Sequence, residues 1–163
     1  MRRHARRFHL FAIVIGFAMS VAGGVALADS HDAAVGSWAL NVAKSKYDPG
    51  PPPKSMTLKI ERAGDGVKVT AVSVSADGVS TQTEYTATYD GKDHPLKGVE
   101  DADTVSVKRI DSNTIERTDK KAGKVLRTYT RKLSADGKTL TATIKGTDAK
   151  GRTIHDQAVF ERQ

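Results

Sequence analysis

The segment AVGSWALNVAKSKYDPGPPPKS, residues 34–55, holds the only tryptophan of the 163-residue chain, Trp38, two positions after Gly36. A lysine-containing stretch follows, and then the proline tract PGPPP, residues 49–53. Proline fixes φ and donates no backbone hydrogen bond, so this tract predicts an extended path and excludes a helix. We interpret it as a rigid crossover that carries the chain from a first strand at Trp38 to a second strand that begins near Lys54.

Beyond Lys54 the sequence alternates apolar and polar residues in one short run after another, which is typical of half-buried strands. The clearest runs are 56–60, 67–71, 85–89, 105–107, 140–144 and 154–160. Turn signals separate them, namely AGDG (63–66), SADG (75–78), YDGKD (89–93), IDSN (110–113), KAG (121–123), SADGK (134–138) and TDAKG (147–151). Glycines in these pairs supply the positive φ that tight hairpins require.

This pattern predicts an all-β domain over residues 35–163, folded as an antiparallel up-and-down meander of about 8–10 strands. Closing a long meander into a barrel removes its exposed edges, so we predict a closed, lipocalin-like barrel. An open curved sheet or a sandwich is the alternative. With a single phenylalanine after residue 28 and few large aliphatic residues, we expect a small interior filled by threonine and valine.

The Gly36-x-Trp38 spacing at the start of such a meander resembles the first strand of lipocalins and related calycin barrels. The resemblance implies that Gly36 and Trp38 close one end of the barrel and that an arginine from a late strand packs over the tryptophan. Arg131 and Arg162 are the candidates, ahead of Arg127. Together with YTATYDGKDHPLKG and GTDAKGR, the opening segment is also similar to small exported bacterial proteins of unassigned function. This similarity implies export and a lipocalin-like fold, but it implies no particular activity.

The first 28 residues have the pattern of a signal peptide. Four arginines at positions 2, 3, 6 and 7 precede an apolar stretch that ends in Ala26-Leu27-Ala28, which is the small-residue pattern that signal peptidase cleaves. We expect cleavage after Ala28, a flexible N-terminus over residues 29–34, and a periplasmic or secreted protein. An uncleaved membrane anchor is the alternative.

Removing that leader changes the net charge from +7 to +3, because 26 − 4 = 22 basic residues then face 19 acidic ones. The remaining lysines and arginines lie among threonines near turns, without the interleaved aromatics of a nucleic-acid interface. We therefore expect no nucleic-acid partner, no stable membrane insertion after cleavage, and a monomer. The chain has no cysteine, which excludes disulfides, a thiol nucleophile and a cysteine metal site.

No motif of a known catalytic or metal site occurs in the sequence. His94, expected in a turn, and His155 lack the spacing of a metal site. Asp101 and Asp103 resemble a fragment of a calcium loop without its downstream acid, and we expect a solvated hairpin there. We predict no catalytic residue, no metal and no cofactor.

Two predicted strands carry tyrosine and arginine on a single face. Alternation over residues 81–89 places Tyr85 and Tyr89 together, and alternation over residues 125–133 does the same for Arg127, Tyr129 and Arg131. Such faces suit a pocket for an amphipathic or anionic small molecule. The prediction is an exported barrel that binds a small hydrophobic or amphipathic ligand through these five residues. The alternatives are an envelope or stress-related interaction module without a ligand, and a barrel-based enzyme.

Overall fold

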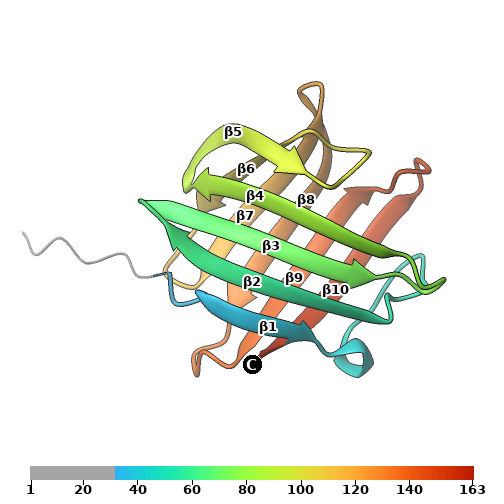
Figure 1. Ribbon diagram of the computed structural model, residues 1–163, viewed down its shortest axis with the longest axis horizontal. Coiled ribbons are helices and arrows are strands. Elements are labelled where there is room, and N and C mark those ends of the chain that lie inside the picture. The colour runs from blue at the N-terminus through green and yellow to red at the C-terminus, as the bar shows by residue number, and fades with distance from the viewer. Residues whose placement is uncertain (1–31) are drawn as a thin grey trace, which may run out of the picture. The chain divides into compact units, whose positions relative to one another are not determined.

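The computed structural model describes residues 32–163 (Figure 1). The predicted signal peptide and residues 29–31 lie outside this range. Ten strands and one short 3-10 helix form a single unit: β1 (Gly36–Leu40), η1 (Val42–Lys44), β2 (Ser55–Ala63), β3 (Gly66–Val74), β4 (Ser80–Thr88), β5 (Asp90–Lys97), β6 (Thr104–Arg109), β7 (Thr114–Lys121), β8 (Lys124–Leu133), β9 (Thr139–Thr147) and β10 (Thr153–Arg162). Within residues 32–163, no helix is long and apolar enough to cross a bilayer.

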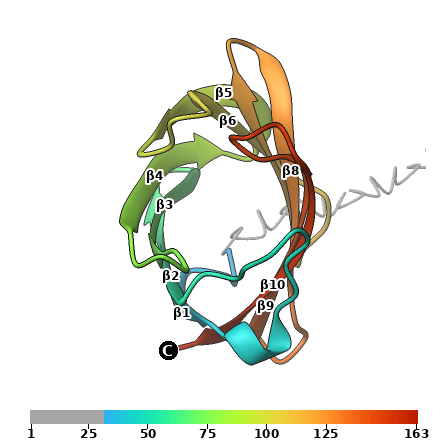
Figure 2. The same cartoon turned by 90° about the vertical axis from the view of Figure 1, so that its right-hand side faces the viewer.

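Every strand pairs antiparallel with its neighbour in sequence, and β1 also pairs with β10, so the sheet closes into a barrel. The predicted closed all-β barrel is confirmed, and the open-sheet alternative is wrong. Figure 2 shows the barrel from the right-hand side of Figure 1, so that the viewer looks into the ring of strands. We call the end that faces the viewer the mouth; it carries the β3–β4, β5–β6, β7–β8 and β9–β10 connections. We call the opposite end, at Trp38, the closed end.

The proline tract belongs to the connection between η1 and β2. Just before it, Lys46 exchanges two backbone hydrogen bonds of 2.8 Å with Gln157, and Asp48 accepts a third from His155. The crossover therefore runs along β10 beyond the point where β1 ends. This placement turns the side chain of Tyr47 toward the barrel interior, where it lines the cavity described below.

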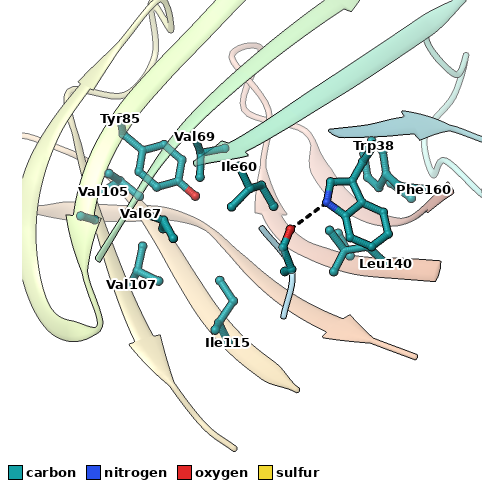
Figure 3. Close-up of a cluster of buried hydrophobic side chains, with 14 of the residues drawn as sticks. Trp38, Ile60, Val67, Val69, Tyr85, Val105, Val107, Ile115, Leu140 and Phe160 are labelled. Carbon is teal, nitrogen blue, oxygen red and sulfur yellow. Dashed lines mark hydrogen bonds between the residues drawn. The ribbon is translucent and has the colours of Figure 1, made fainter. Parts of the chain in front are cut away.

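The closed end is a dense apolar core around Trp38, which is fully buried (Figure 3). Ile60, Leu140 and Phe160 belong to the same buried cluster. The indole Nε1 donates a 2.9 Å hydrogen bond to the backbone oxygen of Ala34. Residues 32–34, within the segment expected to be flexible, thus form a turn against the core, and Ala34 is itself buried.

Arg162, from the last strand, is the arginine that packs over Trp38, with its guanidinium carbon 4.3 Å from the ring centroid. Gly36 is required beside it, because a Cβ there would lie 2.6 Å from Arg162 Nη1 and the glycine has φ +143°. Neither Arg131 nor Arg127 takes this position. The choice depends on β10 pairing with β1, which aligns Arg162 with Trp38.

β5 is the least regular strand. It shares only two aligned residue pairs with β4, and its register with β6 shifts between Asp90 and Asp93. His94, expected in a turn, lies within this strand, and its Nε2 is 3.5 Å from the hydroxyl of Thr88. The sequence pattern was misleading because the turn is shorter than the YDGKD signal, and β5 begins at Asp90.

Candidate functional site

The barrel encloses a cavity of about 620 Å³ on its mouth side. The expectation of a small interior filled by threonine and valine was wrong, but the predicted ligand pocket required free volume of this kind. Many inward positions carry small residues, among them Ala71, Thr83, Ala142 and Ala158, all of which line the cavity. Side chains of this size do not reach the barrel axis, so the same scarcity of large residues leaves the interior partly empty.

The lining divides into an apolar part and a charged part. Strands β2 to β4 and β9 to β10 contribute mostly apolar and small side chains, whereas β7 and β8 contribute Ile115, Arg117, Asp119, Arg127, Tyr129 and Arg131. A cavity with one apolar and one polar wall is complementary to an amphipathic molecule.

Arg117 occupies the middle of the charged wall. Its guanidinium lies between two tyrosine rings, 4.7 Å from the centroid of Tyr85 and 4.6 Å from that of Tyr129. It also donates two hydrogen bonds to Asp119, of 2.7 and 3.0 Å. Burial alone would lower the pKa of Arg117, but Tyr85 and Asp119 outweigh it and raise the pKa above its usual value. The positive charge of Arg117 is thus compensated within the protein.

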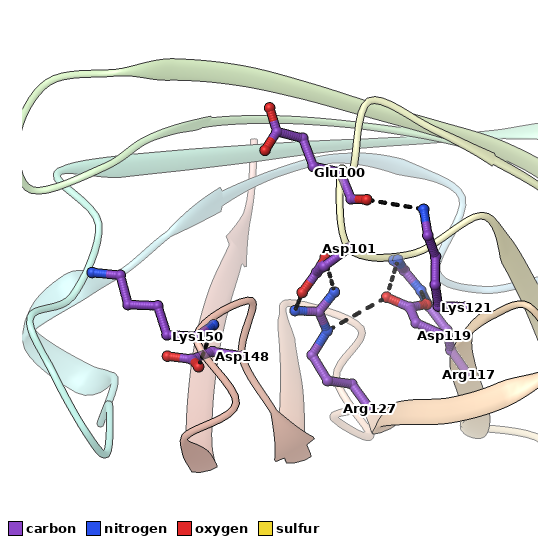
Figure 4. Close-up of polar contacts among 8 residues, drawn as sticks. All are labelled: Glu100, Asp101, Arg117, Asp119, Lys121, Arg127, Asp148 and Lys150. Atoms are coloured by element: carbon purple, nitrogen blue, oxygen red, sulfur yellow. Dashed lines mark hydrogen bonds and ion pairs between the residues drawn. The ribbon is translucent and has the colours of Figure 1, made fainter.

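Arg127 is held in the same way, nearer the mouth. Two hydrogen bonds of 2.8 and 2.7 Å join it to Asp101 on the β5–β6 loop, and its Nε lies 4.0 Å from Asp119 (Figure 4). Bidentate arginine–carboxylate pairs are among the stronger polar contacts in proteins. Asp101 is therefore bound to a side chain of the barrel wall, Arg127, and the expectation of a solvated hairpin was wrong for this residue.

Tyr129 and Tyr85 complete this cluster. Burial and the charge of Asp119 raise the pKa of Tyr129 to about 12, so its hydroxyl is protonated at neutral pH. Tyr85 is also buried. Both tyrosines present ring faces to Arg117, and both line the cavity.

Arg131 differs from the other two cavity arginines. Only 8% of it is exposed, and among residues 32–163 no carboxylate lies within salt-bridge distance and no side chain or carbonyl accepts a hydrogen bond from its guanidinium. It lines the main cavity and also a second one of about 10 Å³ toward the closed end, which has room for one water molecule. A buried cation without an anionic partner is energetically costly, so this group is a candidate for contact with an anion.

A second polar position lies on the wall formed by the crossover and β10. The hydroxyl of Tyr47 is buried and has no hydrogen-bond partner in the described part of the chain. Its burial and the nearby Asp156 raise the pKa of Tyr47 to about 12. Burial also raises the pKa of Asp156 above its usual value, against the effect of a 2.8 Å hydrogen bond from the Asp48 amide.

Four of the five residues predicted to bind a ligand line this cavity, namely Tyr85, Arg127, Tyr129 and Arg131. Tyr89 lies elsewhere: it packs under Arg109, 4.0 Å from ring centroid to guanidinium, and its hydroxyl bonds to Asp32. The prediction missed other polar lining residues: Tyr47, Asp101, Arg117, Asp119 and Asp156. Alternation along residues 115–119 would have placed Arg117 and Asp119 on one inward face, but nothing local indicates that Tyr47 or Asp101 faces the interior.

No group of three or more histidine, cysteine, aspartate or glutamate side chains in residues 32–163 is arranged to hold a metal ion. His94 lies near Asp90, at 3.6 Å, and without a third such ligand. Three arginines and three tyrosines line the cavity together with four acidic residues, Glu100, Asp101, Asp119 and Asp156. An arginine that is not paired with one of these carboxylates suits recognition of an anion by charge and hydrogen bonds.

No protein-family model and no curated protein matches the sequence. Among solved structures, zebrafish ileal bile acid-binding protein complexed with cholic acid is similar to this chain, with a TM-score of 0.50 and 16% identity over 80% of this chain and 99% of that chain. The siderocalin Ex-FABP aligns with a TM-score of 0.35 and 16% identity over 80% of this chain and 74% of that one. The first likeness supports the calycin-type barrel fold.

Proposed function

We propose that the protein binds one small amphipathic molecule with an anionic head in its barrel cavity, and that it acts as a carrier or sequestering protein without catalysing a reaction. The head lies at Arg131, and the apolar part lies against β2 to β4 and β9 to β10. The cavity volume of about 620 Å³ is within the range of roughly 300–1,000 Å³ that is common for small-molecule sites.

The observation that carries this proposal is the buried guanidinium of Arg131, which has no ion-pair partner among residues 32–163 and lines a largely apolar cavity. The other charged lining groups are disposed differently. Asp119 and Asp101 are paired with Arg117 and Arg127. Glu100 is exposed at the rim, and Asp156 lies on another wall. Asp32 lines the second cavity together with Arg131, but its carboxylate bonds to Tyr89 and no salt bridge joins it to Arg131. Among residues 32–163, Arg131 is therefore the cavity position where an anion compensates a charge that no carboxylate pairs with.

Two further observations support the proposal. The zebrafish protein of similar fold is complexed with cholic acid, so a barrel of this architecture can enclose a small molecule. The arginines, apolar stretch and Ala-x-Ala ending of residues 1–28 support export, and we place the protein in the periplasm or outside the cell as a monomer.

The test is a fluorescence titration with 1-anilinonaphthalene-8-sulfonate, an aromatic sulfonate that emits more strongly in an apolar site, followed by displacement with hexadecanoic acid and with uncharged hexadecanol. Arg131→Gln should weaken binding of the sulfonate and of the acid by about 10- to 100-fold, since a hydrogen bond to a charged group contributes about 1.5–3 kcal/mol. Hexadecanol binding should change little.

Lys132→Gln is the matched control, because it removes the same charge from the adjacent residue of β8, which is exposed on the outer face. It should leave all three affinities unchanged. If the wild-type protein binds none of the three compounds, or if the two variants behave alike, the proposal is wrong.

A further inference from the structure

The crossover and β10 bring Tyr47 and Asp156 side by side. Lys46 and Gln157 form an antiparallel bridge, and in such a pairing the next residue of one strand faces the preceding residue of the other. Tyr47 thus lies opposite Asp156. Both side chains line the cavity, so they form a polar pair on an otherwise apolar wall.

This pair has unused hydrogen-bonding capacity. Tyr47 Oη is buried without a partner in residues 32–163. Asp156 accepts one bond, from the Asp48 amide to Oδ1, and no described residue donates to its other oxygen. A buried hydroxyl without a partner carries the cost of its lost hydration. A ligand group that bonds to both side chains would remove that cost.

The pair lies at a defined offset from Arg131. Asp156 is aligned with Ile144 of β9, which is aligned with Tyr129 of β8. Arg131 is two residues further along β8. A strand rises about 3.4 Å per residue, and neighbouring strands lie about 4.8 Å apart. The pair therefore lies about 7 Å closer to the mouth than Arg131 does, and about 10 Å from Arg131 around the circumference of the barrel. Apolar Ile144 and the small Ala158 line the surface between the two positions.

We propose that Tyr47 and Asp156 form a second subsite, which hydrogen-bonds a hydroxyl on the body of the bound molecule while its anionic head lies at Arg131. The preferred ligand is then a hydroxylated amphipathic acid. This inference rests on the proposed function, and it adds a second recognition point to it. The carboxyl group of Asp156 accepts from a hydroxyl but repels a carboxylate, so the pair also orients the ligand with its head toward Arg131.

The experiment compares hexadecanoic acid with a panel of hydroxyhexadecanoic acids in which the hydroxyl moves along the chain, each displacing the aromatic sulfonate. We expect one or two hydroxyl positions to bind about tenfold more tightly than the parent acid. Tyr47→Phe should reduce that preference to about twofold or less and leave the affinity of the parent acid unchanged. Tyr89→Phe, which alters a tyrosine outside the cavity, should keep the preference.

The outcomes separate the two ideas. If no acid of the panel displaces the sulfonate, the proposed function itself fails. If the acids bind but no hydroxyl position is preferred, or the preference survives in Tyr47→Phe, the second subsite is wrong and the proposed function stands. Circular dichroism should show that the Tyr47→Phe variant is folded, because the hydroxyl that it loses has no hydrogen-bond partner among residues 32–163.

Discussion

Two arginines on the inside of the barrel, Arg162 at the closed end and Arg131 in the cavity, differ in what their guanidinium groups contact. Arg162 stacks on Trp38 and donates hydrogen bonds of 2.7, 2.9 and 2.7 Å to the backbone oxygens of Gly137, Val35 and Ala33. Arg131 is buried to a similar or greater degree but has no such acceptor among the described residues.

The difference shows how an arginine that stabilises the fold can be distinguished from one that is available to a ligand. Both lie on β-strands next to apolar side chains, so sequence and burial alone do not separate them. The separation lies in whether the chain supplies acceptors for the guanidinium donors. Arg117 supports the same view, since its charge is compensated by Asp119 and by the faces of Tyr85 and Tyr129.

The largest expected effect is at the closed end. Trp38→Ala should lower the free energy of unfolding by about 3–5 kcal/mol, because it leaves a cavity where a fully buried indole packs. Urea unfolding at 25 °C measures it. Trp38→Phe, which keeps a ring but loses the bond to Ala34, should cost less. A loss below about 1 kcal/mol for the alanine variant would show that the closed end does not anchor the barrel.

A paired measurement tests the comparison directly. Arg162→Met should lower the free energy of unfolding by about 2–3 kcal/mol, because three backbone oxygens lose a charged donor. Arg131→Met should leave it unchanged or raise it by up to about 1 kcal/mol, because an uncompensated buried charge is replaced by an apolar chain. Equal losses in the same urea experiment would mean that Arg131 has a structural role as well.

The smallest expected effect concerns pH and Asp156. Burial raises its pKa in the folded protein above the unfolded value of about 3.9, so wild-type stability falls as pH rises through the interval between the two pKa values. Asp156→Asn retains an acceptor for the Asp48 amide and removes this penalty. At pH 7 it should melt at a slightly higher temperature than the wild type, which corresponds to a gain of less than about 1 kcal/mol in the free energy of unfolding.

Thermal melts of the two proteins at pH 3 and pH 7 measure this difference, which should disappear at the lower pH. The hydrogen bond from the Asp48 amide and the charge of His155 lower the pKa of the same carboxyl group, whereas the charge of Asp48 raises it. A variant that is less stable than the wild type at pH 7 would indicate that ionised Asp156 stabilises the fold, as the groups of the closed end do.

Much of the site could be predicted from local alternation. It placed Tyr85, Arg127, Tyr129 and Arg131 on inward faces, and the cavity lining agrees. It also placed Tyr89 on the same face as Tyr85, but β4 ends at Thr88, and beyond that point alternation no longer predicts direction. The inward position of Tyr47 depends on the crossover pairing with β10, far away in the sequence.

The sequence by itself determined the strands, the hairpins and the closed all-β barrel, because turn residues and alternation act over a few neighbouring positions. The tertiary structure decided which arginine covers Trp38 and that small inward side chains leave a cavity. It also decided that Arg127 is paired with Asp101, whereas Arg131 has no carboxylate partner within residues 32–163. These outcomes depend on contacts such as Arg162 with Ala33, 129 positions apart. Such contacts exist only after the first and last strands have closed the barrel.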